Sequence, residues 1–243
     1  MESYRQAGGP AKIIPMAKEL RFTPELFTFL RELKANNNRE WFEANKPRFQ
    51  ADVRDPLLAF VAAWRPRLLN LSPHFIADPK PVGGSVSRIH RDQRFSKNKD
   101  PYKTALYLAF WHEVRKVNTP VFYLQLDLDQ CFMAMGIYQP DTPTRQLIAH
   151  TIATHADEWQ SIKQEKDFKK TFKFGGESLQ RVPKPYEPDH PLAEDLKRKD
   201  FIVVANLTEK QVCAKDFLDK FETTCATAAP LLRFLTRTVN LTW

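Results

Sequence analysis

The chain has 243 residues, of which 42% are hydrophobic and 12% aromatic, and its 37 Lys or Arg against 29 Asp or Glu give a formal net charge of +8. This composition is sufficient for a large buried core and excludes wholesale disorder. No segment approaches the roughly 18 apolar residues of a membrane span, and three cysteines without a CxxC pair argue against a disulfide framework. We therefore expect a soluble, cytoplasmic protein whose charge favours anionic partners.

The first third of the chain predicts a flexible arm followed by helices. Residues 1–20 contain a double glycine and two prolines, so we expect an arm there and one α+β domain over 21–243. Pro24 suits the first turn of a helix, and the asparagines at 36–38 end that helix and cap the next. The following helical region, 38–71, contains three prolines, which predict kinks or separate short helices.

The middle of the chain predicts the sheet. Residues 104–112, 121–128 and 131–138 have the aromatic and aliphatic content of strands, and 121–128 alternates cleanly. A later strand is expected at 201–204. Helices at both ends around an antiparallel run indicate an α+β fold, with a meander-like antiparallel sheet and helices from both terminal regions packed on it.

The second and third strands predict a hairpin with a two-residue turn at 129–130. This turn pairs Leu126 with Met133 on an apolar face that belongs to the core. The other face pairs Tyr123 with Gly136, and such small residues leave room for a packing helix or for a ligand.

Two features are expected after the hairpin. Residues 142–163 read as one long helix in which His155 belongs to the apolar stripe and packs in the core. Thr208 and Gln211 fit a capping box at the start of a C-terminal helix.

The common catalytic signatures are absent from the sequence. Neither a Walker A motif nor GxGxxG can be written in a chain with these seven glycines, and GxSxG and HExxH do not occur. No pair of histidines has a strong metal-ligand spacing, so no metal site is expected and no cofactor is assigned. Asp127 and Asp129 could act as paired carboxylates, although Asp129 also suits the expected turn.

The strongest signal is the basic segment RIHRDQRFSKNKDPYK at residues 88–103. Its six Lys or Arg and two Asp leave a net charge of +4, half that of the whole chain. Interleaved aromatic residues suit stacking plus phosphate contact, and Asp92 is expected to hold an arginine by a bidentate pair. The alternative is an exposed loop with local ion pairs.

Four separate blocks also resemble one known family. They are NREWF (38–42), R-x-x-RD-x-RFS-x-x-K-x-PYK (88–103), G-x-Y-x-P (136–140) and L-x-R-V-P-K…DHP (179–191). Together they are similar to the conserved hypothetical family called domain of unknown function 2461, which comprises uncharacterised bacterial and fungal proteins. The resemblance spans roughly Phe22 to Phe201 and implies one domain but no activity.

The family pattern, carried over residue by residue, covers most of the basic segment, including Phe95 and Ser96. This chain departs from it at Asn98, where an acidic residue is usual, and at His90, where an aromatic one is usual. The second departure argues against His90 as a catalytic base.

We hypothesise a cationic pocket for a phosphorylated or carboxylated small molecule. The residues expected to bind the anion or line the pocket are Arg88, Arg91, Arg94, Lys99, Tyr102, Lys103, Gly136 and Tyr138. The sequence does not decide between binding and catalysis, and Asp92 or Asp127 is the expected general base if a reaction takes place. The alternatives are a nucleic-acid-binding module using the same residues, or a structural domain whose arginines brace the NREWF helix through Glu40 and Glu43.

Overall fold

The structure is a computed structural model that describes residues 21–92, 94, 99–114 and 117–243. The expected arm at 1–20 lies outside the described residues. The helices are α1 (Pro24–Ala35), α2 (Arg39–Ala44), α3 (Lys46–Arg48), the π-helical η1 (Phe49–Arg54), α4 (Asp55–Leu71), α5 (Thr142–Thr154), α6 (Ala156–Gln164), α7 (Lys166–Thr171), α8 (Ala193–Leu196), α9 (Glu209–Val212) and α10 (Phe217–Thr238). The strands are β1 (Leu106–Trp111), β2 (Val121–Leu126), β3 (Cys131–Ile137), β4 (Lys173–Phe174) and β5 (Phe201–Leu207).

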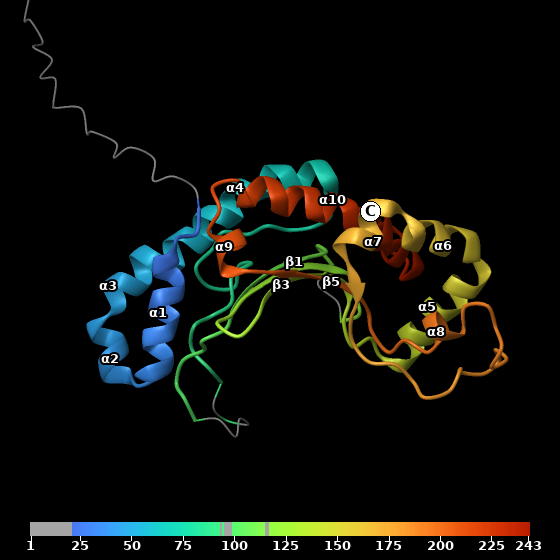
Figure 1. The fold of residues 1–243 in the computed structure, drawn as a ribbon, viewed down its shortest axis with the longest axis horizontal. Coiled ribbons are helices and arrows are strands. Elements are labelled where there is room, and N and C mark those ends of the chain that lie inside the picture. Colours follow the sequence, from blue (N-terminus) through green and yellow to red (C-terminus); the bar gives the residue numbers. More distant parts are fainter. Residues whose placement is uncertain (1–20, 93, 95–98, 115–116) are drawn as a thin grey trace, which may run out of the picture.

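The five strands form one antiparallel sheet in the order β1-β2-β3-β5-β4, which confirms the predicted α+β class. Helices α4 and α10 lie together over one face of this sheet (Figure 1). Phe110 of β1 meets both of them, with its ring 6.2 Å from that of Trp64 and 6.1 Å from that of Phe221. This face carries the apolar side chains and builds the core.

The hairpin has the predicted faces but not the predicted register. Leu124 pairs with Met133, so four residues, 127–130, separate the two strands and the two-residue turn is wrong. A shift of two residues leaves every side chain on its expected face because side chains alternate along a strand. Residues distant in sequence contact the longer loop: Gln130 Nε2 donates to Asn206 Oδ1 at 3.0 Å, and Asp129 lies 3.4 Å from Lys34.

The expected helix at 142–163 is two helices. The chain bends at His155, whose φ of −119° and ψ of 46° end α5 before α6 begins. His155 is exposed, so its predicted place in the core is wrong, and its Nδ1 lies 3.1 Å from the Thr154 hydroxyl. The apolar stripe around it is buried as predicted, because each short helix still directs its own apolar residues inward.

Two local predictions about the helices are confirmed. The proline-containing region 38–71 is divided into α2, α3, η1 and α4, although Pro66 lies inside α4. Thr208 and Gln211 form the predicted capping box, with the Gln211 backbone N–H donating to the Thr208 hydroxyl at 3.2 Å. The helix that it starts, α9, ends at Val212, and the C-terminal helix α10 begins separately at Phe217.

Gly136 is required by the packing of two strands. Its φ is +131°, and a Cβ built there would lie 2.0 Å from the carbonyl oxygen of Phe201 on β5. The space beside Gly136 is therefore filled by backbone, which differs from the expectation that it leaves room for a ligand.

Replacing Gly136 with alanine should destabilise the protein strongly, because β3 and β5 must separate to admit the methyl group. We expect a loss of about 3 kcal/mol, or roughly 6–12 °C in Tm, in a thermal unfolding experiment. Gly83→Ala is the matched control, since Gly83 also has a positive φ of 73° but a Cβ added there would have no atom within 4 Å. It should cost only about 1 kcal/mol, and equal losses in the two variants would contradict this reading.

Candidate anion-binding site

The basic segment is an irregular ribbon that follows residues 85–87, and these pair with the outer side of β1 through Val86 and Leu108. The Arg91 amide N–H donates to the Pro101 carbonyl at 2.9 Å, and the Lys103 amide N–H donates to the Ile89 carbonyl at 2.7 Å. These bonds place Arg88 and Arg91 beside Lys103. Part of the connecting turn, including Phe95, Ser96 and Asn98, lies outside the described residues.

Tyr102 fixes this ribbon to the N-terminal helices. Its ring is 3% exposed and stacks on Phe42 of α2, with 4.1 Å between centroids. Asn37 binds both sides of the Tyr102 backbone: its Oδ1 accepts the Tyr102 N–H at 3.1 Å, and its Nδ2 donates to the Tyr102 carbonyl at 3.0 Å. Burial raises the pKa of the Tyr102 hydroxyl. Tyr102 is thus an anchor within the fold, whereas the sequence suggested a ligand contact.

Three cations gather on this ribbon. Among the described residues, none forms an ion pair with Arg88, Arg91 or Lys103. The Nε atom of Arg91 is buried and has no hydrogen-bond partner there. Burial, together with the positive charges of Arg88 and Arg91, lowers the pKa of the Lys103 ammonium group. Such an arrangement is unfavourable without a counter-ion, because buried donors and like charges both cost free energy.

Asp92 and Arg94 form the expected bidentate pair, with Arg94 Nε 3.0 Å from Asp92 Oδ1 and Nη2 2.7 Å from Oδ2. This interaction lowers the pKa of the Asp92 carboxyl group. The side chains are 49% and 77% exposed, so the pair adds little to stability. Asp92 is therefore occupied by its arginine and is poorly suited to the expected role of general base.

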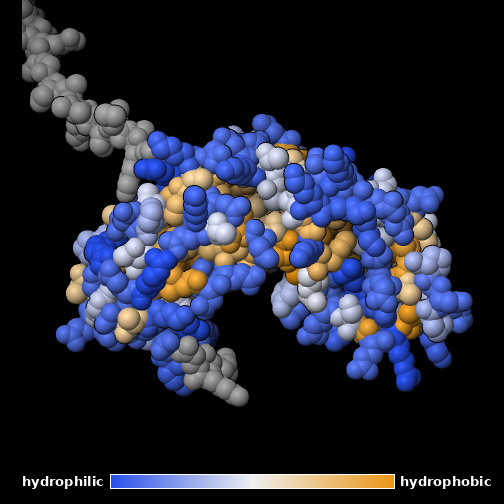
Figure 2. Space-filling model, viewed as in Figure 1, coloured by the Kyte–Doolittle hydropathy of each residue, from blue (hydrophilic) through white to orange (hydrophobic). Residues whose placement is uncertain are grey.

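The sheet face opposite the core carries a row of aromatic side chains. Tyr107 and Tyr123 stack with centroids 5.5 Å apart, and Phe132 follows at 5.9 Å from Tyr123. All three are half-buried, and the surface is hollowed below the sheet, on the side away from α4 and α10 (Figures 1 and 2). Lys103 Nζ lies 5.3 Å from the centroid of the Tyr107 ring, so the cations adjoin this row.

Tyr123 lies in the middle of the row, between Tyr107 and Phe132. Its hydroxyl donates to Gln125 Oε1 at 3.0 Å, and burial raises its pKa to about 12, with Tyr107 and Asp127 as lesser causes. Sequence reasoning placed Tyr123 and Gln125 on this face but did not join Tyr107 or Phe132 to the site. The alternation of Tyr107 with Leu106 and Leu108 would have located it there.

Other predicted residues do not meet the three cations. Tyr138 is 60% exposed and follows the Ile137 end of β3, whereas Lys103 precedes the Leu106 end of β1. The strand pairing places these two positions at opposite ends of the strands. Asp127 is half-buried in the loop after β2, and Lys99 is exposed.

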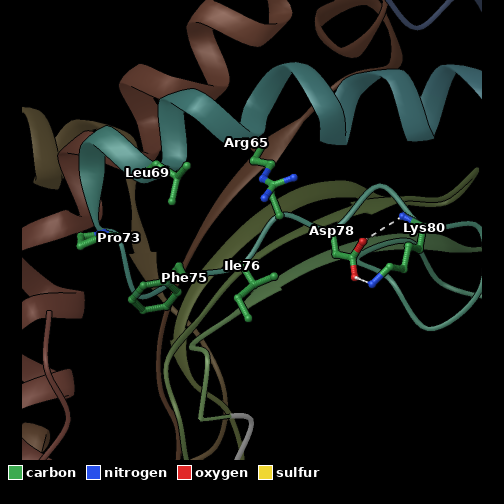
Figure 3. A pocket seen from close by; sticks show the side chains of 8 residues that line it. Arg65, Leu69, Pro73, Phe75, Ile76, Asp78 and Lys80 are labelled. Carbon is green, nitrogen blue, oxygen red and sulfur yellow. Dashed lines mark hydrogen bonds and ion pairs between the residues drawn. The ribbon is translucent and has the colours of Figure 1, made fainter.

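A separate cavity of about 280 Å³ lies between α4 and the segment before the ribbon. Figure 3 shows Arg65 of α4 pointing toward this segment, where Asp78 pairs with Lys80 at 3.2 Å. The side chains that line it include none of the predicted anion-binding residues. In the part of the chain that the structure describes, no group of three or more His, Cys, Asp or Glu could hold a metal ion. None of the described helices is long and apolar enough to cross a membrane.

The protein is of the α+β class, with one antiparallel sheet and a basic ribbon next to β1. The profile of the family described as "Conserved hypothetical protein (DUF2461)" matches residues 25–234, and the chain belongs to that family. No curated protein matches the chain.

Asn37→Ala should show how far the fold depends on the Tyr102 anchor. The variant leaves an N–H and a carbonyl group of Tyr102 without their partner, so we expect a loss of about 2 kcal/mol in the free energy of unfolding, measured with urea. Asn36→Ala is the control, because the Asn36 side chain only bonds Glu32 of its own helix, at 2.9 Å. Similar losses in both variants would show that Asn37 has no special role.

Proposed function

We propose that residues 21–243 act as one intracellular domain that binds a phosphorylated or carboxylated ligand between Arg88, Arg91 and Lys103. The observation that carries the proposal is the buried Nε of Arg91, which has no hydrogen-bond partner among the described residues. Among the described residues five buried side-chain atoms lack a partner, and of these Arg91 Nε alone belongs to a charged group. Native proteins pair nearly all of their buried polar groups, so an unpaired cationic donor beside two further cations supports a missing acceptor with negative charge.

The three side chains suit such an acceptor by their chemistry. An arginine guanidinium presents two parallel N–H groups to carboxylate or phosphate oxygens, whereas lysine adds a compact positive charge. A bound anion would offset the repulsion that now lowers the pKa of Lys103.

The bracing hypothesis is less well supported. It requires the arginines to hold α2 through Glu40 and Glu43, but the carboxylate of Glu43 pairs with Lys46 at 3.0 Å. The ribbon contacts α2 through rings: Tyr102 stacks on Phe42, and the His90 ring lies 6.1 Å from that of Phe42. Among the described residues Arg91 has no ion-pair partner, whereas the charge of Arg88 helps Arg94 to lower the pKa of the Asp92 carboxyl group.

The positions of the two candidate bases support binding more strongly than catalysis. Asp92 is engaged by Arg94, and Asp127 lies in the hairpin loop, so neither candidate base is presented to the three cations. Binding of an anion requires no base.

Arg91→Met should weaken anion binding without harming the fold. We expect wild-type protein to bind inorganic phosphate saturably at one site in isothermal titration calorimetry, and Arg91→Met and Lys103→Met each to weaken it at least about tenfold, since each removes a charge-assisted hydrogen bond. Lys220→Met is the matched control, because Lys220 lies on α10, over the other face of the sheet, and pairs with Asp216 at 2.9 Å.

The Tm of Arg91→Met separates binding from bracing. It should equal or exceed that of the wild type, because the variant removes an unsatisfied buried nitrogen and one like charge. A fall of several degrees, or the lack of any saturable phosphate binding by the wild type, would contradict the proposal.

A further inference from the structure

The aromatic row on the open sheet face begins where the cationic ribbon ends. Lys103 touches Tyr107, Tyr107 stacks on Tyr123, and Tyr123 is followed by Phe132, so the row crosses β1, β2 and β3 in turn. A ligand anchored by its anionic group at Lys103 therefore has ring surfaces beside it in one direction along the sheet.

The row is not needed to complete the core. The core face of the same strands is lined by buried Leu, Phe and Met side chains under α4 and α10. Tyr107, Tyr123 and Phe132 stay half-buried on the other face, where Figure 2 shows the hollow. Among the described residues the Tyr107 hydroxyl has no hydrogen-bond partner, and it is absent from the buried groups, so it is available to a ligand.

We propose that the ligand carries a flat ring as well as its anionic group, in the size class of a nucleoside monophosphate. This inference rests on the proposed function, because the cations fix the position from which the ring extends. The phosphate lies between Arg88, Arg91 and Lys103, and the ring contacts the row that starts at Tyr107. Aromatic side chains hold a base by stacking, and the phosphate contacts orient it.

The distribution of charge favours a single nucleotide over a nucleic acid strand. A protein that follows a strand needs cations spaced along the track, because each phosphate it neutralises contributes to affinity. Here the three cations of the ribbon are grouped at one end of the row. The three aromatic side chains of the row, and Gln125 beside them, carry no positive charge.

The test compares adenosine 5′-monophosphate with ribose 5-phosphate, which has the same phosphate but no ring. We expect the nucleotide to bind about tenfold more tightly to the full-length protein in titration calorimetry, as stacking of one base allows. Tyr107→Leu should bring the two affinities together. Because Tyr107 also contacts Lys103, the quantity compared is the ratio of the two affinities in each protein. Tyr186→Leu is the matched control, since Tyr186 is another half-buried tyrosine, placed beside His190 and away from the row.

Three outcomes overturn the inference, and they differ in what else they overturn. Equal affinities for the two compounds would contradict the claim that the ligand carries a ring, but they would leave the proposed anion site intact. Failure of both compounds and of inorganic phosphate to bind would remove the anion site as well. Tight binding of a ten-nucleotide single strand, with a salt slope steeper than about −2, would indicate more than three phosphate contacts and a nucleic acid strand as the ligand.

Discussion

The two hydrogen bonds between Asn37 and the backbone of Tyr102 are the constraint on which the candidate site depends. They join residues that are 65 positions apart and hold the ribbon against the turn between α1 and α2. The stack of Tyr102 on Phe42 directs that side chain inward. Because neighbouring side chains on an extended chain point to opposite sides, Lys103 then turns toward the open sheet face.

The residues of the basic segment therefore have different roles. Tyr102 provides stability, since its ring is buried in the core. Asp92 and Arg94 satisfy each other at the surface. Arg91 and Lys103 are instead half-buried with no counter-ion among the described residues, a state that a protein retains at a cost to stability and that is common at functional sites. The function proposed above is the benefit that would offset this cost.

Local patterns in the sequence were sufficient for the class of fold and for the faces of the strands. Alternation placed Leu124 and Met133 in the core and Tyr123 on the other face, and these assignments hold even though the register differs by two residues. The register itself could not be derived locally, because β3 also pairs along its length with β5, where Met133 lies opposite Ala205. The capping box of α9 was predictable for the opposite reason, as all of its bonds lie within four residues.

The candidate site was only partly predictable from the sequence. Charge density located the basic segment, but it could not separate Arg94, which is paired with Asp92, from Arg91, since that difference depends on side-chain geometry. Nor could it show that Tyr102 belongs to the core, because the partner Phe42 is far away in the chain. Gly136 was interpreted as space for a ligand, whereas the carbonyl of Phe201 occupies that space. In each case the missing information was a contact between side chains or between distant segments.

The most direct measurement of the central claim is the ¹H–¹⁵N resonance of the Arg91 Nε–H group during titration with inorganic phosphate. The signal is assigned by its loss in Arg91→Met. If Arg91 Nε is the unsatisfied donor of an anion site, its proton resonance should shift downfield and saturate with phosphate, while the Nε–H signal of Arg67, which is paired with Asp219 and Glu222, stays in place. An Arg91 signal that does not move while the protein is exposed to saturating phosphate would contradict the account.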